Sequence, residues 1–429
     1  MASRTLIRER VGLAFAARRL RRTPYSRETP NVIRRAFRLA AAALTLAFAT
    51  GCAPQLNPDF NPPYICRTNS PVTESVYLLG DAGDAELADD EGSDLVDPVL
   101  LSLQRRVDAR VDVLGEEHTA VIFLGDNIYP SGLAPPGHRD RRRGERILDA
   151  QIAAVGRARG YFTLGNHDWN QAKKEGLERA LTQYEYLSRA APNIAVQPQA
   201  PCPGPGVVDF GDELRLVFGD LWAAIYRQKY PTSGIDGCDS DPNVSGPGVF
   251  QQAFKRAFDS APERRIVFVV HAPLITSGPH GGYFRWREHL FPLRVLNPNL
   301  WIPLPIIGTV FPLARMMGVT DTDMMSSNYR GYITNVSKSF RPGRPALVAA
   351  GHEHSLQLHV DGRGIFHAIS GAASMDKVDY VRRLRSDLMS LAAPGYMRLD
   401  QHADGTLNLE IIALDDDEVD QSVFYTCVP

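Results

Sequence analysis

The class of fold is decided by a short stretch of the chain, AVIFLGDNIY at residues 120–129. An apolar run bounded by glycine predicts a fully buried β-strand at residues 120–124. Gly125 then lets the backbone turn sharply, and the carboxylate of Asp126 follows at once. In open α/β sheets, ligands bind in the crevice beyond the carboxyl ends of the strands. The stretch therefore predicts a buried strand that ends at a functional carboxylate.

Four other places in the chain repeat this arrangement of an apolar strand followed by Asp, Asn or His, most of them beside glycine. The predicted strands are residues 76–79, 163–164, 266–270 and 345–350. The polar residues that follow them are Asp81, Asn166, His167, Asp168, His271, His352 and His354. Helix-like patterns lie at residues 94–114, 144–159, 170–189 and 248–260. Alternation of strands and helices predicts a layered α/β domain.

The donor atoms of these residues indicate a metal site. Carboxylates, an amide, imidazoles and the nearby phenol of Tyr129 are too many for one ion, and they suit two metals with mixed oxygen and nitrogen ligands. Two metals can hold a phosphate group, lower the pKa of water and stabilise a leaving oxygen. A single Gly-Asp is usually a turn, and a single buried histidine is usually part of the core. The recurrence after five strands is what predicts the site.

These five blocks together resemble the purple acid phosphatases, which belong to the calcineurin-like metallophosphoesterase superfamily. The blocks are Gly-Asp-x-Gly at 80–83, Gly-Asp-x-x-Tyr at 125–129, Gly-Asn-His-Asp at 165–168, Val-His at 270–271 with Pro273, and Gly-His-x-His at 351–354. The resemblance implies a four-layer sandwich of two mixed β-sheets flanked by helices, with the metals at one edge. It covers most of the chain after about residue 66.

The resemblance also implies a role for each ligand. Asp81, Tyr129 and His354 would bind a ferric ion, Asp126 would bridge, and Asn166, His271 and His352 would bind a divalent iron, zinc or manganese ion. Tyr129 separates this family from most of the superfamily, because a phenolate three places after the bridging Asp favours Fe(III). Phe268 departs from the family pattern, in which valine is often found, but both residues are apolar.

Three further residues are predicted to act on the substrate or its neighbours. In the family, the histidine at the position of His167 faces the substrate phosphate. His280 lies nine residues after His271, a spacing that resembles the mammalian-type small acid phosphatases, where this histidine helps to hold phosphate and protonates the leaving group. Histidine suits proton transfer at neutral or mildly acidic pH. Asp168 is predicted to orient His167.

Composition limits the classes of function. The chain has 429 residues and a formal net charge of -2, so no basic field predicts nucleic-acid binding. The predicted activity is hydrolysis of phosphomonoesters, with a phosphate ester as the partner molecule. Two alternatives remain open: a phosphodiesterase or nucleotide pyrophosphatase on the same scaffold, and an inactive surface-binding protein.

The first 52 residues predict export. Arg34, Arg35 and Arg38 precede an apolar run at 39–49, which is too short to span a bilayer and is typical of a signal peptide. Cys52 follows as in a bacterial lipobox, which implies lipidation and membrane anchoring; an ordinary signal peptide with a chance cysteine is the alternative. The adjacent arginines also resemble a twin-arginine signal. We expect a periplasmic, outer-membrane lipoprotein or extracellular location.

The rest of the chain divides into a Pro-rich tether at 53–71 and a metallophosphoesterase domain at 72–429. Four further cysteines in an oxidising compartment allow three pairings, and we predict Cys66–Cys427 at the two ends of the domain and Cys202–Cys238 within one loop region. Residues 283–332 are Pro-rich and apolar, and they predict an inserted loop or cap. A lid or a membrane-surface contact are the alternatives for this insertion.

Overall fold

The computed structural model describes residues 55–56, 68–87, 96–199, 202–230, 238, 246–295, 299–375, 377–384 and 386–429. The predicted leader at 1–52 and most of the tether at 53–71 lie outside the described residues.

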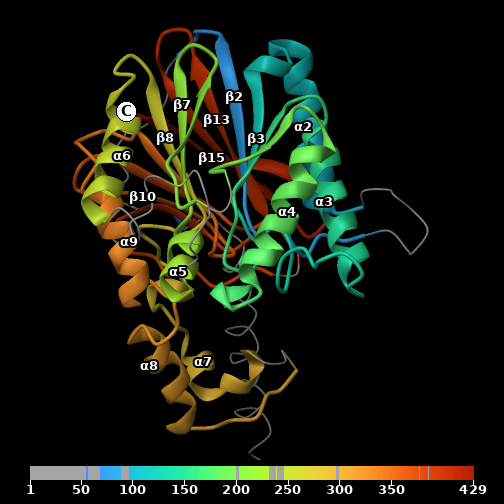
Figure 1. The fold of residues 1–429 in the computed structure, drawn as a ribbon, viewed down its shortest axis with the longest axis vertical. Helices are drawn as coiled ribbons and strands as arrows, with labels where there is room; N and C mark the ends of the chain where they lie inside the picture. The colour runs from blue at the N-terminus through green and yellow to red at the C-terminus, as the bar shows by residue number, and fades with distance from the viewer. Residues whose placement is uncertain are drawn as a thin grey trace, which may run out of the picture. The chain divides into compact units, whose positions relative to one another are not determined.

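Two β-sheets form the centre of the domain (Figure 1). The larger sheet has the order β6 (Gly206–Phe210), β7 (Leu214–Gly219), β8 (Arg265–Val270), β9 (Leu347–Ala350), β11 (Phe366–Ser370), β10 (Leu356–Val360), β12 (Asp387–Leu391) and β1 (Gln55–Leu56). The other has the order β5 (Ile194–Val196), β4 (Arg159–Phe162), β3 (Thr119–Phe123), β2 (Val72–Leu79), β13 (Gly395–His402), β14 (Leu407–Leu414) and β15 (Asp420–Val428). Both sheets are mixed, with parallel pairing at their centres, as in β7–β8–β9 and β2–β3–β4.

The central strands are buried on both faces, which explains their continuous apolar sequences. In β2, the side chains of Val76 and Leu78 lie in the core between the two sheets. Tyr77 and Leu79 point to the opposite face and pack beneath the helices. Because successive side chains of a strand point to opposite faces, one apolar run fills two cores.

Helices cover the outer face of each sheet (Figure 1). The smaller sheet is covered by α2 (Pro98–Leu114), α3 (Arg141–Val155) and α4 (Gly176–Ala190), and the larger by α5 (Leu221–Lys229), α6 (Pro247–Asp259) and α9 (Ser327–Ser337). The helix α2 begins where the Asp97 side chain accepts a hydrogen bond from the Leu100 amide at 3.0 Å, with Pro98 in the first turn, an arrangement favoured at helix N-termini. The four-layer sandwich predicted from the sequence is confirmed.

A helical projection, which we define as residues 283–325, extends from one end of the sandwich (Figure 1). It contains α7 (Trp286–Leu290), α8 (Val310–Met316) and the short 3₁₀ turns η5 (Pro292–Val295) and η6 (Ile307–Thr309). The predicted insertion ran to residue 332, but Tyr329 and Tyr332 lie in α9 and are buried in the core. No helix among the described residues is long and apolar enough to cross a membrane.

One disulfide joins Cys202 to Cys238, with a Cα–Cα distance of 5.3 Å, and this pairing confirms the prediction. Cys427 is disulfide-bonded. Cys66, the partner that we predict for it, lies outside the described residues.

Candidate metal centre

The loops after β2, β3, β4, β8 and β9 meet at one edge of the sandwich, and very close backbone packing brings them together. Glycine permits this packing. A Cβ atom added at Gly165 would lie 2.2 Å from Oδ1 of Asp126, and one added at Gly125 would lie 2.7 Å from Nδ1 of His271. The glycines beside the predicted ligands are therefore required by the approach of one loop to another.

Three of the predicted ligands have left-handed backbone conformations. The φ angles are 64° at Asp81, 53° at Asp126 and 73° at His352. Asp and His are among the residues other than glycine that adopt this region most often. The sharp turns redirect these side chains from the strand direction into the space between the loops.

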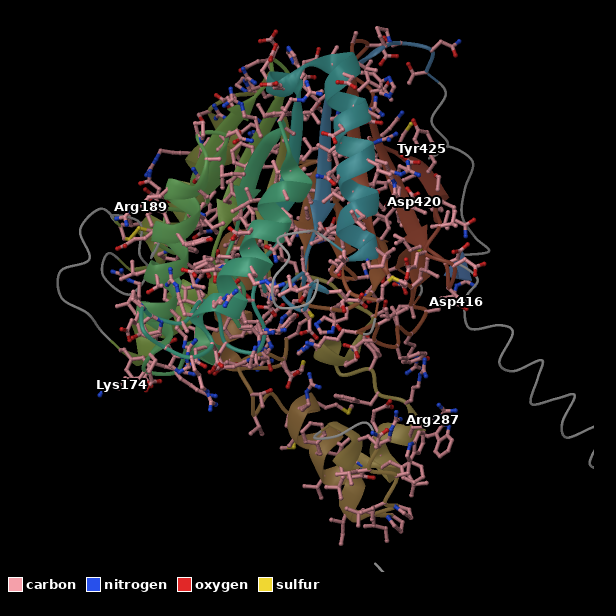
Figure 2. All side chains as sticks on the ribbon, turned by 90° about the vertical axis from the view of Figure 1, so that its right-hand side faces the viewer. Lys174, Arg189, Arg287, Asp416, Asp420 and Tyr425 are labelled. Carbon is pink, nitrogen blue, oxygen red and sulfur yellow. A yellow bond between two sulfur atoms is a disulfide. The ribbon has the colours of Figure 1, made fainter. Side chains whose placement is uncertain are left out.

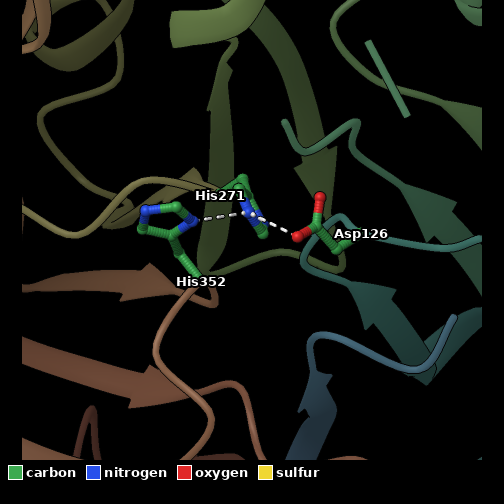
Figure 3. A group of neighbouring side chains, drawn as sticks. All are labelled: Asp126, His271 and His352. Atoms are coloured by element: carbon green, nitrogen blue, oxygen red, sulfur yellow. Dashed lines mark hydrogen bonds and ion pairs between the residues drawn. The ribbon is translucent and has the colours of Figure 1, made fainter. Parts of the chain in front are cut away.

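Asp126, His271 and His352 form a buried cluster whose donor atoms all lie within 4.8 Å of one another (Figure 3). The distance from Nε2 of His271 to Oδ2 of Asp126 is 3.4 Å. Nδ1 of His352 lies 3.2 Å from the same imidazole nitrogen, and Oδ1 of Asn166 lies 3.1 Å from it. Four side chains from four different loops thus direct nitrogen or oxygen atoms at one point.

The tautomers of the two histidines follow from their other contacts. Nδ1 of His271 lies 2.8 Å from the carbonyl oxygen of Leu124, so it carries the proton and donates. Nε2 of His352 lies 2.8 Å from the carbonyl oxygen of Thr322 and donates in the same way. In the neutral imidazoles, the remaining nitrogens would present lone pairs to each other and to the Asn166 carbonyl oxygen. These contacts therefore need a cation, which is either a proton on His271 or a metal ion between the donor atoms.

A second set of donor atoms lies on the other side of Asp126. The Tyr129 hydroxyl is 2.9 Å from Oδ1 of Asp81 and 3.3 Å from Oδ2 of Asp126. Nε2 of His354 lies 3.0 Å from the same hydroxyl, while Nδ1 of this imidazole faces Asp379 at 3.6 Å. Asp126 is therefore in contact with both sets.

The electrostatics of the centre favour positive charge. Burial lowers the pKa of His271, but the Asp126 carboxylate reverses this effect and raises the pKa to about 9. Burial likewise lowers the pKa of His354, and its hydrogen bond and charge interaction with Asp81 raise the pKa to about 9. Burial and the charge of Asp81 raise the pKa of Tyr129 well above its usual value. The carboxylates thus attract a cation, either a proton or a metal ion, into the centre.

His167 and His280 line a cavity of about 280 Å³ beside these ligands, together with Asp126, His352 and His354. Nδ1 of His167 lies 2.6 Å from the Pro130 carbonyl oxygen. The ring of His280 stacks near that of His352, with centroids 4.0 Å apart. The structure thus places both predicted substrate-facing histidines beside the candidate metal ligands.

Asp168 does not have the predicted role. Its buried carboxylate accepts hydrogen bonds from the amides of Gly165, Asn127 and Ile128, at 2.8, 3.1 and 3.3 Å. The His167 ring instead contacts the Pro130 carbonyl group, so the prediction that Asp168 orients this ring is wrong. A carboxylate with several backbone donors in reach satisfies those amides first, because an unpaired buried amide is costly. Asp168 ties the loop after β3 to the loop after β4.

Several residues near the centre were missed in the sequence. Oδ1 of Asp323 lies 3.2 Å from Nδ1 of His280, and Arg315 binds the same carboxylate at 2.6 Å. Glu353 is fully buried and accepts from the Thr276 hydroxyl at 2.9 Å and the His280 amide at 3.0 Å. Arg315 and Asp323 belong to the helical projection, where no strand precedes them and no motif marks them.

A second cavity, of about 560 Å³, adjoins the first. Residues of the helical projection line one side and the loop at 377–380 lines the other. His280, Phe311, Arg315 and His354 line both cavities. The lining of the second cavity also includes Arg285, Arg287, Arg294 and Lys377, so a space rich in positive charge leads to the candidate metal ligands.

No protein-family model matches the chain, and no curated protein matches it in sequence. Solved structures do match. GAP50, the anchor in the inner membrane complex of Plasmodium, is 13% identical over 83% of this chain and 89% of that chain, with a TM-score of 0.44. The purple acid phosphatase PPD1 from yellow lupin (Lupinus luteus) seeds is 12% identical over 80% of this chain and 52% of that chain, with a TM-score of 0.47. PhoD is 10% identical over 85% of this chain and 70% of that chain, with a TM-score of 0.45. The match thus spans about half of the lupin enzyme, and at such identities and scores the likeness carries no conclusion about activity.

Proposed function

We propose that the chain is a metal-dependent phosphoric ester hydrolase of the acid phosphatase type, acting on phosphomonoesters at a dinuclear centre. One observation carries the proposal: Nε2 of His271 lies 3.1–3.2 Å from Oδ1 of Asn166 and Nδ1 of His352, and 3.4 Å from Oδ2 of Asp126. A buried group of nitrogen and oxygen atoms that needs a cation at its centre is an arrangement that a metal ion satisfies.

The two sets of donors suit two different ions. The phenol and carboxylate of the first set favour Fe(III), and the imidazoles and amide of the second favour a divalent Fe, Zn or Mn. The first set is Asp81, Tyr129 and His354, the second is Asn166, His271 and His352, and Asp126 lies between them. When bound, two such cations neutralise the phosphate and lower the pKa of water so that it can attack phosphorus.

The chain itself supplies a proton for the leaving oxygen. Nδ1 of His280 lies 2.9 Å from Nη2 of Arg315 and 3.2 Å from Oδ1 of Asp323, which leaves Nε2 to act on the substrate. Burial raises the pKa of Asp323, but hydrogen bonds from His280 and Arg315 outweigh it, so the pKa is lowered overall. The carboxylate of Asp323 and the guanidinium of Arg315 thus hold the ring of His280 from its Nδ1 side. His167 is the second candidate for contact with the phosphate.

Removal of the metals tests the proposal directly. Dialysis against a chelator should abolish hydrolysis of p-nitrophenyl phosphate, because the donor atoms alone cannot neutralise the phosphate, and reloading with iron and zinc should restore it. Elemental analysis of the active protein should find two metal ions per chain. Protein that holds two metals but hydrolyses no phosphate ester would instead support the inactive surface-binding alternative.

A Tyr129→Phe variant tests the ferric assignment. A ferric phenolate absorbs visible light, so the wild-type iron form should be coloured and the variant should lose this band. The fold should persist, because the ring packs against His167 at 4.5 Å and beneath Lys377 at 3.8 Å, and phenylalanine keeps both contacts. A visible spectrum and a thermal unfolding curve measure the two effects. A colourless wild-type iron form would contradict the ferric assignment.

The second cavity supports a phosphodiesterase as the alternative activity. A diester has a substituent on each side of the phosphorus, and a space of about 560 Å³ beside the cluster can hold the second one. Rates on p-nitrophenyl phosphate and bis(p-nitrophenyl) phosphate distinguish the two activities, since a phosphomonoesterase strongly prefers the first.

We also infer that the protein is exported. The Cys202–Cys238 disulfide fits an oxidising compartment, as does the predicted leader. Its expected partners are a phosphate-ester substrate and, through a lipidated Cys52, a membrane.

A further inference from the structure

The helical projection exposes an unusual amount of apolar surface. Most of the large apolar side chains that are exposed in the described part of the chain belong to it. They are Trp286, Trp301, Ile302, Ile306, Ile307, Val310, Phe311, Leu313, Met316, Met317, Val319 and Met325. Ile306, Ile307 and Met317 are 87%, 70% and 77% exposed. Soluble proteins rarely expose so many apolar residues together, unless the surface binds a partner or a membrane.

The central segment of the projection carries no charged residue, and arginines flank it. Residues 295–314 contain no Asp, Glu, Lys or Arg, and arginines bound them as Arg294 and Arg315. Arg285 and Arg287 precede the same segment, and Figure 2 shows Arg287 on the projection. We call residues 299–314 the tip and Arg285, Arg287 and Arg294 the arginine collar. An uncharged apolar tip beside a basic collar is the pattern of proteins that lie in the interface of a membrane.

One exposed side chain of the tip belongs to a residue with an unfavourable backbone conformation. Ile306 has a φ angle of 69°, a conformation that is strained for a β-branched residue. The strain does not serve burial, since Ile306 is the most exposed large apolar residue described. Backbone strain that persists without a packing reason is typical of functional positions.

The acidic residues of the projection do not cancel the collar. Asp323 is bound by Arg315 at 2.6 Å, and Asp321 is bound by Lys229 at 2.5 Å. Glu288 is the remaining acidic side chain of the segment. The collar thus keeps an excess of positive charge, which attracts anionic lipid headgroups.

We propose that the helical projection inserts its tip into the outer layer of a lipid bilayer that contains anionic lipids, with the arginine collar at the level of the headgroups. Charge favours an anionic bilayer over a second copy of the chain as the partner of the tip, because two copies that met tip to tip would bring two collars of like charge together. The interaction is separate from catalysis, so its test needs no enzyme activity and its outcome leaves the proposed hydrolase unaffected.

Vesicle sedimentation tests the proposal with exported protein that carries Cys52→Ser, which removes any acyl anchor. This protein should bind phosphatidylglycerol-containing vesicles more tightly than pure phosphatidylcholine vesicles. A double variant, Ile306→Asn with Ile307→Ser, should bind about tenfold more weakly or worse, because two exposed isoleucines no longer enter the lipid. The matched control, Val113→Ser with Val419→Ser, removes exposed valines elsewhere and should bind as the parent does.

The collar is tested in the same assay. Arg287→Glu should lower affinity for the anionic vesicles roughly fivefold or more and leave binding to zwitterionic vesicles nearly unchanged. Its control is Arg189→Glu, on the exposed surface of α4 far from the projection in Figure 2. Thermal unfolding should be the same for all variants.

Fluorescence locates the tip in the membrane. Trp286 and Trp301 are exposed, whereas Trp169 and Trp222 are buried, so brominated lipids should quench the emission of the first pair only. Trp301→Phe should remove a large part of this quenching. Absence of binding to both kinds of vesicle, or equal binding by the isoleucine variant, would overturn the proposal. A dimer in light scattering that the same variant abolishes would assign the tip to a second copy instead.

Discussion

Asp126→Asn should remove most of one bound metal and nearly all phosphatase activity without unfolding the protein. Oδ2 of Asp126 faces the Tyr129 hydroxyl at 3.3 Å and Nε2 of His271 at 3.4 Å, so it lies between the two predicted metal positions. An amide lacks the negative charge that two cations share. The loss should exceed the roughly 10–100-fold effect typical of a residue that only orients a metal ligand.

Asparagine is the substitution that best preserves the backbone. Asp126 has a φ angle of 53°, which Asn tolerates. Oδ1 of Asp126 accepts from the His167 amide at 2.8 Å, and an asparagine oxygen can accept the same hydrogen bond. The control is Asp220→Asn, another buried carboxylate, whose side chain caps α5 by accepting from Trp222 and Ala223. Asn also caps helices, so this control should keep both metals. Elemental analysis and assays of both variants decide, and wild-type metal content and activity in Asp126→Asn would exclude a bridging role.

His280→Ala should reduce turnover of alkyl phosphates by roughly 10²–10⁴-fold, the usual contribution of a general acid. An alkoxide leaves poorly without a proton, whereas p-nitrophenolate leaves as an anion, so the loss should be smaller for p-nitrophenyl phosphate. Both metals should remain, because His280 is not proposed as a ligand. An equal loss for both substrates would show that His280 binds phosphate without donating a proton, and wild-type rates would leave His167 as the remaining candidate acid.

The Asp323→Asn variant separates positioning from catalysis in this pair. Oδ1 of Asp323 lies 3.2 Å from Nδ1 of His280 and helps to orient the ring, so its loss should lower kcat for alkyl phosphates more than kcat for p-nitrophenyl phosphate. A purely structural role would lower both rates equally. Arg315, which binds the same carboxylate, remains as a donor in the variant.

The central part of the fold could be predicted from the sequence because its strands are buried on both faces. Residues 76–79, 120–124 and 266–270 correspond to β2, β3 and β8, and their apolar runs leave little ambiguity. The strand β4 spans Arg159–Phe162, earlier than the strand predicted at 163–164, and the helix predicted at 144–159 overlaps its first residue. Gly156, with a φ angle of 56°, ends α3 at residue 155. The helix predicted from residue 170 begins only at Gly176, because Asn170, Gln171 and Ala172 have left-handed φ angles.

The strands after β9 were not identified individually, because buried polar residues interrupt their apolar pattern. Asp400 in β13 accepts from the Ser75 hydroxyl at 2.6 Å, and Glu410 in β14 pairs with Arg398 at 2.8 Å. Each of these polar side chains pairs with a residue of a neighbouring strand, and a single sequence does not show such pairs.

The candidate ligands could be located from the sequence because each follows a strand directly, and the end of a strand fixes where the next residue lies. The partners of His280 could not, because Arg315 and Asp323 reach it from the helical projection, whose position depends on tertiary packing. The role of Asp168 was missed for a related reason: its neighbour His167 is adjacent in sequence, but the amides of two loops are nearer in space.

The hydrogen bonds around the ligands bear on how the protein acquires its metals. One carboxylate oxygen of Asp81 accepts from the His352 amide at 2.7 Å, and one of Asp126 accepts from the His167 amide. The backbone thus holds the donor atoms in place without help from a cation, unlike zinc fingers, which fold only when metal binds. Nitrogen and oxygen sites discriminate weakly among neighbouring divalent metals. Under the proposed function, the supply of metal where the chain matures would decide the divalent ion that it carries.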